Sequence, residues 1–170
     1  MKLSVIIPLY NKENTIKKTV LSILQQDSAR FEVEIVIIND GSTDKSEDEV
    51  KRIKDERVFL YTQRNAGVSA ARNEGIKRSN GEFIMFLDAD DQLMDNCFIE
   101  YYRLLESYPN YNVYGTNFIY STGNTDIVYC KIIKDFISKN CFKDMYFHRI
   151  YPRPGSFIIK KGCIATVGLF

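Results

Sequence analysis

The sequence predicts a single α/β domain built on an open, mostly parallel β-sheet. Short apolar runs rich in β-branched residues alternate along the chain with segments of helical periodicity. Clusters of polar residues follow directly after these apolar runs. The composition, with 45% hydrophobic and 26% charged residues over 170 positions, is that of an ordinary globular domain with its own core.

The first forty residues predict two strands with a helix between them. The continuous apolar run at 3–7 predicts a strand buried on both faces, as in a parallel sheet. Asn11 is a candidate cap for a helix over about 13–26, whose apolar residues recur at the spacing of one helical face. The run at 33–38 predicts a second buried strand, and a turn and another helix follow it.

The same alternation continues through the middle of the chain and weakens after residue 107. A fourth strand ends directly at an acidic cluster. The later segments predict further strands and one more helix. In order, the expected elements are strand 58–61, helix 68–77, strand 83–87, helix 95–107, strands 111–120 and 127–131, helix 132–139 and strand 156–160.

Composition also excludes several classes of protein. A net charge of +1 gives no general attraction to nucleic acid. The four cysteines lack the spacing of zinc or redox sites. The first apolar run stops at Pro8, too short for a signal peptide or a membrane span, which predicts a cytoplasmic location. The segment 131–161 is basic and rich in aromatic residues, so a peripheral contact with the membrane is an alternative to ordinary core packing.

The segment Asp88-Ala89-Asp90-Asp91 places three carboxylates within four positions at the end of a buried strand. Like charges this close repel one another unless a cation or hydrogen-bond donors offset them. Mg²⁺ prefers oxygen ligands and usually takes one or two carboxylates together with substrate phosphates. The cluster therefore predicts a site for Mg²⁺ or Mn²⁺. The alternative is that Asp90 and Asp91 only cap the next helix.

Two other polar clusters are expected beside these acids, because ligands of parallel α/β sheets bind at the carboxyl ends of the strands. Residues 39–44 (NDGSTD) offer acceptors for a ribose hydroxyl or a base imide, or they simply form a turn. Residues 65–73 (NAGVSAARN) combine a glycine turn with a helix that carries Arg72. We expect this guanidinium to be a counter-ion of the acids, a ligand of nucleotide oxygens, or both.

Four ordered motifs together resemble the family-2 glycosyltransferases of the GT-A fold. They are residues 4–11 (SVIIPLYN), 39–44, 65–73 and 88–91. The resemblance is close over residues 3 to about 119 and looser as far as Gly168-Leu169-Phe170. It implies a Rossmann-like three-layer sandwich with a mostly parallel sheet. It also implies one GT-A domain over 1–170, with a nucleotide-sugar half at 1–119 and the start of an acceptor-binding half at 120–170.

The resemblance further implies a role for individual residues. The side chains expected around the nucleotide are Pro8 and Tyr10 in the base pocket, Asp40 on the uracil or equivalent base, Arg72 facing the nucleotide and Asp88 on the ribose. Asp90 would hold the metal that bridges the diphosphate, and Asp91 would be a helix cap or a contact of the donor sugar.

The activity implied is inverting transfer of a sugar from a nucleoside-diphosphate sugar, with a UDP-sugar as the expected donor. The acceptor would be a hydroxyl of a glycan or lipid-linked molecule in surface polysaccharide or glycolipid synthesis. Inverting transfer needs a carboxylate base to take the proton of that hydroxyl. In the family an acidic motif follows a segment like Val167-Gly168-Leu169-Phe170, so we expect the base beyond Phe170 and name none. Without it the chain would be a donor-binding fragment.

A rival interpretation of the acid pair is a haloacid-dehalogenase-like phosphohydrolase, in which the first aspartate is a nucleophile. That motif lies near the N-terminus and continues to Thr or Val two residues after the second aspartate, where this chain has Gln92. A dinucleotide-dependent oxidoreductase is disfavoured, because no G-x-G-x-x-G follows the first strand.

Overall fold

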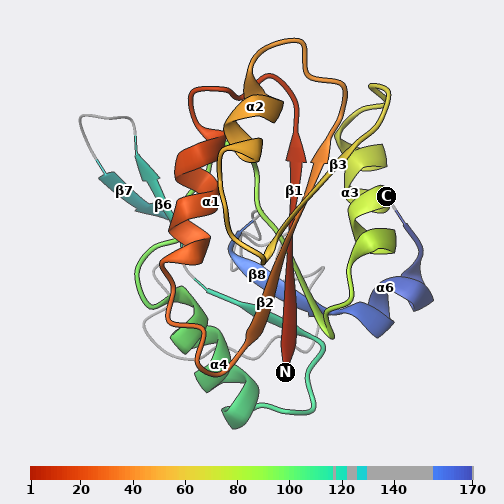
Figure 1. The fold of residues 1–170 in the computed structure, drawn as a ribbon. Coiled ribbons are helices and arrows are strands. Elements are labelled where there is room, and N and C mark those ends of the chain that lie inside the picture. Colours follow the sequence, from red (N-terminus) through yellow and green to blue (C-terminus); the bar gives the residue numbers. More distant parts are fainter. Residues whose placement is uncertain (117, 122–125, 130–154, 170) are drawn as a thin grey trace.

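The computed structural model describes residues 1–116, 118–121, 126–129 and 155–169 (Figure 1). The helix expected at 132–139 and most of the basic aromatic segment lie outside these residues.

Six strands form one sheet in the order β3-β2-β1-β4-β8-β5. The first four strands along the chain are parallel, as the alternation of strands and helices predicts. The last two strands in the sheet order are β8 and β5. β8 pairs antiparallel with β4 on one side and with β5 on the other. The strands are β1 (Lys2–Leu9), β2 (Glu32–Asn39), β3 (Val58–Thr62), β4 (Phe83–Phe86), β5 (Val113–Gly115) and β8 (Phe157–Lys160), with β6 (Phe118–Ser121) and β7 (Asp126–Tyr129) forming a separate antiparallel pair.

Helices cover both faces of the sheet, which makes the three layers that the family resemblance implies (Figure 1). On one face, alternate residues of β1 pack against apolar residues of α1 and α4. On the other face, Ile6 and Ile84 pack against Ala71 and Ile76 of α3 and Ile164 of α6. The helices are α1 (Ile16–Leu24), α2 (Ser46–Lys51), α3 (Val68–Arg78), α4 (Cys97–Ser107) and α6 (Lys161–Val167).

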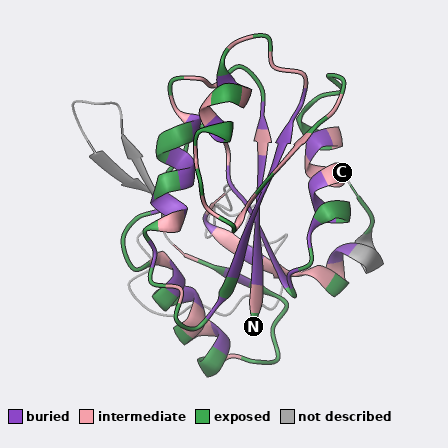
Figure 2. Cartoon of the chain, in the orientation of Figure 1, coloured by how far each residue is buried: buried purple, intermediate pink, exposed green. Residues whose placement is uncertain are grey.

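Burial explains why the first two strands have continuous apolar sequences. Residues 3–7 of β1 and 33–39 of β2 are buried on both sides, so neither strand has a face toward water (Figure 2), and Ser4, Glu34 and Asn39 are the polar residues within them. The contacts on opposite faces come from successive residues, because side chains alternate along a strand.

Asn11 does not cap α1, contrary to the sequence prediction. The helix begins at Ile16, with Thr15 at the N-cap position. Asn11 adopts φ +50°, and its Oδ1 accepts a hydrogen bond of 2.8 Å from the backbone N–H of Thr43. Its side chain therefore joins the loop after β1 to the loop after β2, and it is not available to the helix.

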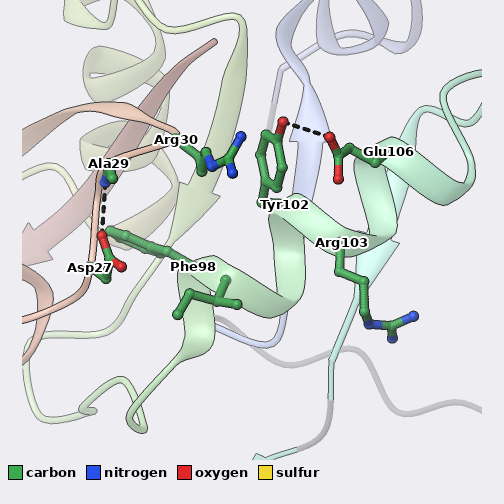
Figure 3. Close-up of a pocket in the computed structure, with 8 residues that line it drawn as sticks. Asp27, Ala29, Arg30, Phe98, Tyr102, Arg103 and Glu106 are labelled. Carbon is green, nitrogen blue, oxygen red and sulfur yellow. Dashed lines mark hydrogen bonds between the residues drawn. The ribbon is translucent and has the colours of Figure 1, made fainter.

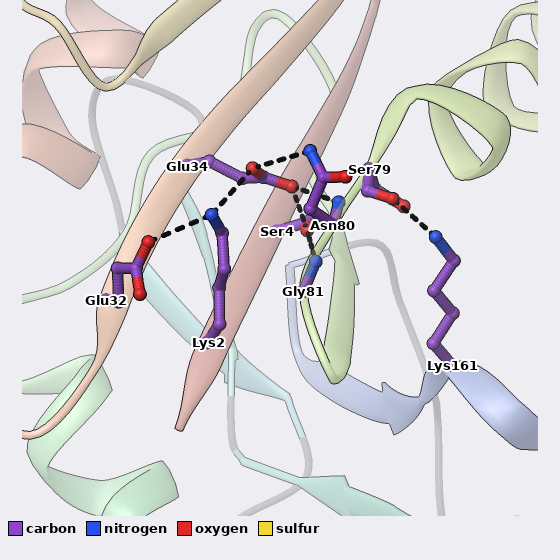
Figure 4. A network of polar contacts seen from close by, with 8 residues as sticks. All are labelled: Lys2, Ser4, Glu32, Glu34, Ser79, Asn80, Gly81 and Lys161. Atoms are coloured by element: carbon purple, nitrogen blue, oxygen red, sulfur yellow. Dashed lines mark hydrogen bonds and ion pairs between the residues drawn. The ribbon is translucent and has the colours of Figure 1, made fainter.

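A polar network holds the amino ends of β1 and β2 to the turn before β4 (Figure 4). Its centre is Glu34, whose side chain is 5% exposed. Ser4 Oγ donates to Glu34 Oε1 at 2.6 Å, and the backbone N–H of Asn80 donates to the same oxygen. Lys2 Nζ lies 3.3 Å from Glu34 Oε2. The network lies at the opposite end of β1 and β2 from the polar clusters, so it fixes the sheet without entering the candidate site.

Candidate functional site

The polar clusters meet at the carboxyl ends of β1, β2 and β4. β1 lies between β2 and β4, so the strand order reverses beside it, which is the position where open α/β sheets bind ligands. A pocket of about 540 Å³ opens there. Its lining includes all six residues that the sequence predicts for the nucleotide and the metal, namely Pro8, Tyr10, Asp40, Arg72, Asp88 and Asp90.

Arg72 and Asp88 form an ion pair across the pocket. Arg72 comes from the second turn of α3, and its Nη2 lies 2.8 Å from Asp88 Oδ1. The guanidinium carbon also lies 6.0 Å from the centroid of the Phe86 ring, which holds the group against the end of β4. The side chains are 17% and 39% exposed, so Arg72 is the more enclosed partner and Asp88 keeps a surface toward the pocket.

Lys12 is a residue of the pocket that the sequence reasoning missed. Its Nζ lies 2.6 Å from Asp90 Oδ2. The backbone N–H of Lys12 donates to the buried Ser46 Oγ at 2.7 Å, so the main chain that carries this lysine is fixed. The sequence shows only that Lys12 follows the first strand as Asp90 follows the fourth, and the structure adds that these two strands are neighbours in the sheet.

Asp40 is almost fully buried, with 3% of its surface exposed. Its Oδ1 accepts hydrogen bonds from Gln63 Nε2 at 2.7 Å and from the backbone N–H of Ala66 at 2.9 Å. Its Oδ2 accepts one from the backbone N–H of Gly67 at 2.8 Å. The carboxylate therefore joins the end of β2 to the loop that starts α3. Since two carboxylate oxygens offer about four acceptor sites, one remains for a ligand.

A second pocket, of about 410 Å³, lies between the loop before β2 and the outer side of α4 (Figure 3). Arg30 stacks on the ring of Tyr102, with the guanidinium carbon 5.0 Å from the ring centroid, and Tyr102 donates to Glu106 at 2.7 Å. None of the residues predicted for the nucleotide or the metal lines this pocket. The convergence of motifs therefore selects the pocket at the carboxyl ends of the strands as the candidate site.

Comparison with known proteins identifies the family. The family model for "Glycosyl transferase family 2" matches residues 4–163, nearly the whole chain. This chain belongs to glycosyltransferase family 2. The match confirms the resemblance carried by the four motifs. It also removes the haloacid-dehalogenase interpretation, in which the acid pair would lie near the N-terminus and not after β4.

Individual relatives agree with the assignment of this glycosyltransferase family 2 chain. It is 38% identical to glycosyltransferase GlyA of Streptococcus pneumoniae serotype 4 over 109 residues, which are 63% of this chain and 15% of GlyA. Among solved structures, S. aureus TarS 1–349 in complex with UDP-GlcNAc matches with a TM-score of 0.81 at 22% identity, over 98% of this chain and 47% of that one.

A mannosyltransferase from Pyrobaculum calidifontis, PcManGT in complex with GDP-Man and Mn²⁺, matches with a TM-score of 0.73 at 19% identity, over 99% of this chain and 47% of that one. The two structural matches show that the family-2 chain has the GT-A fold. The chain spans about half the length of these solved structures and a smaller part of GlyA.

The acidic segment of the family-2 chain does not cap a helix. The next helix, α4, begins at Cys97 with Asn96 at its N-cap position, so Asp90 and Asp91 lie too far upstream. The cap role considered for these two acids is therefore wrong. The backbone N–H of Asp91 instead donates to the carbonyl of Asp88 at 3.0 Å, which makes the segment a tight turn.

The site fits a divalent cation that takes few ligands from protein. The described residues contain no group of three or more His, Cys, Asp or Glu side chains placed to hold a metal by themselves. Asp90 nevertheless presents a carboxylate that is 46% exposed, lines the pocket and already binds an ammonium group. Such a single hard oxygen donor suits Mg²⁺ or Mn²⁺, which complete their coordination with water and substrate phosphates.

The described part of the family-2 chain has no helix with the length and apolar character needed to span a membrane.

Proposed function

We propose that this chain carries the donor-binding part of an inverting glycosyltransferase that uses a nucleoside-diphosphate sugar, with a UDP-sugar as the expected donor. Residues 1–119 would hold the nucleotide and residues 120–170 would begin the acceptor side. The observation that carries the proposal is the convergence of Asp40, Arg72, Asp88 and Asp90 on one pocket from two strand ends and a helix.

The charge of the pocket supports a donor that binds together with a divalent cation. Its lining holds three carboxylates and two cationic side chains, Lys12 and Arg72. A diphosphate adds further negative charge, so another cation is required to offset it. When bound, the divalent cation neutralises the charge that develops on the departing nucleoside diphosphate. Asp90 would hold it together with oxygens of the diphosphate.

The remaining residues would bind and orient the nucleotide. Tyr10 is 47% exposed and offers an aromatic face for the base, beside Pro8. Asp40 would accept a hydrogen bond from the base imide with its remaining acceptor site. Asp88, fixed by Arg72, would accept one from a ribose hydroxyl.

The relatives support a sugar nucleotide and a metal. TarS is solved with UDP-GlcNAc, and PcManGT with GDP-Man and Mn²⁺. We extend these ligands to this chain as a class, a nucleoside-diphosphate sugar with a divalent cation. The acceptor is proposed to be a hydroxyl of a glycan or lipid-linked molecule in surface polysaccharide or glycolipid synthesis.

We assign the catalytic base to none of the described residues. Of the acids downstream of residue 120, Asp126 begins β7, whereas Asp135 and Asp144 lie outside the described residues. The second candidate function is therefore donor binding without transfer, which the same residues of the pocket would support.

Calorimetry with UDP and Mn²⁺ tests the proposal. We expect metal-dependent binding of UDP by the wild-type chain, loss of the metal dependence in Asp90→Ala, and weaker UDP binding with metal dependence retained in Asp40→Ala. Asp48→Ala changes an exposed acid of α2 and should bind as wild type does. If Asp90→Ala kept full metal-dependent binding, the metal assignment would be wrong. Release of UDP from a UDP-sugar in the presence of acceptor would separate a complete enzyme from a donor-binding chain.

A further inference from the structure

α1 and the residues at its two ends carry a row of polar side chains beside the apolar face of the helix, half-buried at Thr15 and buried at the other three positions. Thr15, Thr19, Ser22 and Gln26 are spaced by four, three and four residues, so they lie on one side of the helix. Thr19 is 0% exposed, Ser22 9% and Gln26 8%. The polar side of a helix on a sheet normally faces solvent, so the burial of this row needs a partner. We call these four residues the polar row of α1.

The partner is the backbone of residues 89–94, which immediately follows Asp88. Thr15 Oγ1 and Thr19 Oγ1 donate to the carbonyl of Ala89 at 2.9 and 3.0 Å. The backbone N–H of Leu93 donates to Ser22 Oγ at 3.0 Å. Gln26 Nε2 donates to the carbonyl of Met94 at 3.0 Å. This segment has no helix or strand of its own, so these bonds replace the hydrogen bonds that regular structure would supply.

Thr15 uses its hydroxyl for this contact and does not cap the helix with it. Threonine at an N-cap position normally accepts a hydrogen bond from a backbone N–H of the first turn. Thr15 occupies the N-cap of α1 but makes no such bond. Its hydroxyl donates to the Ala89 carbonyl, which belongs to the peptide that joins Ala89 to Asp90.

We propose that the polar row of α1 positions the acidic segment, and that Thr15 and Thr19 are the positioning residues for Asp90. Two donors on one carbonyl fix the orientation of the peptide between residues 89 and 90. Rotation of that peptide would turn the Asp90 carboxylate away from Lys12 and from the pocket. This inference rests on the proposed function, because it assigns the two hydroxyls to the geometry of the proposed metal ligand.

The test separates the hydroxyl groups from the volume of the side chains. Thr15→Val/Thr19→Val keeps the shape and removes both donors, whereas Thr15→Ser/Thr19→Ser keeps both donors and removes two methyl groups. We expect the valine pair to lose about tenfold in Mn²⁺-dependent UDP affinity, since two hydrogen bonds are removed. The serine pair should bind within about threefold of wild type, although the cavities that it creates lower the Tm.

Amide hydrogen exchange adds a measurement that needs no donor. Exchange at Asp91 and Leu93 should become faster in the valine pair and stay near wild type in the serine pair. Thr62→Val is the matched control, because it makes the same change at an exposed residue of β3. The Thr62 hydroxyl lies 3.4 Å from Glu47 Oε2 and does not contact the acidic segment. If the valine pair does not fold, Thr15→Val against Thr15→Ser gives the same comparison at a half-buried position.

The outcomes distinguish this inference from the proposed function. Equal UDP affinity and equal exchange in the valine and serine pairs would overturn the positioning role and leave the proposed function standing. Absence of Mn²⁺-dependent UDP binding by the wild-type chain would remove the proposed function and the metal-positioning role with it.

Discussion

Lys12 Nζ lies 2.6 Å from Asp90 Oδ2, so a lysine occupies the place beside the carboxylate to which we assign a divalent cation. The two side chains are 41% and 46% exposed. An ion pair with this exposure contributes no more than about 1 kcal/mol, because water screens it. A divalent cation that also binds the diphosphate would displace the ammonium at small cost.

Lys12→Met should therefore strengthen Mn²⁺ binding in the absence of nucleotide. Removal of the competing ammonium should raise the affinity by up to about fivefold, measured by electron paramagnetic resonance of free Mn²⁺. Lys17→Met makes the same change of charge on the exposed side of α1 and should have little effect. In an Asp90→Asn background, Lys12→Met should change nothing. If Lys12→Met bound Mn²⁺ with the same affinity as the wild type, the ammonium of Lys12 would not compete with the cation for Asp90.

Asp40→Asn should destabilise the protein whether or not Asp40 binds a base. The amide has a single acceptor oxygen, and its NH₂ group would face Gln63 or a backbone N–H of Ala66 or Gly67. A buried donor left without an acceptor costs about 1–3 kcal/mol in the free energy of unfolding. Urea denaturation measures this loss, with Asp48→Asn on exposed α2 as the control. An unchanged urea midpoint would mean that the loop before α3 rearranges so that no buried donor is left without an acceptor.

The stability of the sheet should depend on pH through Glu34. Burial by itself raises the pKa of Glu34, but hydrogen bonds from Asn80, Ser4 and Lys2 together bring that pKa below its ordinary value of 4.5. The folded state thus favours the carboxylate. Its contribution is fully present above the ordinary pKa and is lost as the pH falls through the folded pKa.

We expect the free energy of unfolding of the wild-type chain to fall as the pH is lowered below about 4.5, with a shallower fall in Glu34→Gln. Urea titrations from pH 7 to 3.5 would measure both slopes. Other acids contribute to each slope, so the difference between the two proteins isolates Glu34. Parallel curves would show that Glu34 gains no net stabilisation from its network.

Gly75→Ala should destabilise the packing of α3 on β1. A Cβ at this position would overlap the side chain of Ile6, which is fully buried. We expect a loss of about 1–3 kcal/mol from overpacking, which exceeds the gain of about 1 kcal/mol in helix propensity. Gly162→Ala in α6 meets no described atom within 4 Å and should be neutral or slightly stabilising in thermal denaturation. Equal changes in Tm for Gly75→Ala and Gly162→Ala would contradict the close approach of α3 to β1.

The sequence predicted the parts of the site that follow buried strands. The runs at 3–7, 33–38 and 83–87 are apolar except for Ser4 and Glu34, so their burial and the position of the polar clusters could be inferred locally. The ends of α1 and the role of Asn11 were predicted wrongly, because Asn11 bonds to a residue 32 positions away and not to its own helix.

By itself, the sequence determined the order of strands and helices as far as α4, the parallel half of the sheet and the strand end that carries Asp88 and Asp90, whereas the strand expected at 111–120 is divided between β5 and β6, in different sheets, and α6 was not expected. Periodicity reports these features because it depends only on which side chains avoid water. The tertiary structure alone decided that Lys12 meets Asp90, 78 residues away, and that a polar row of α1 is buried against residues 89–94. It also decided that β8 enters the sheet beside β4. These pairings depend on which distant segments the folded chain brings together. The local sequence around a polar side chain is the same whether that side chain bonds to water or to protein.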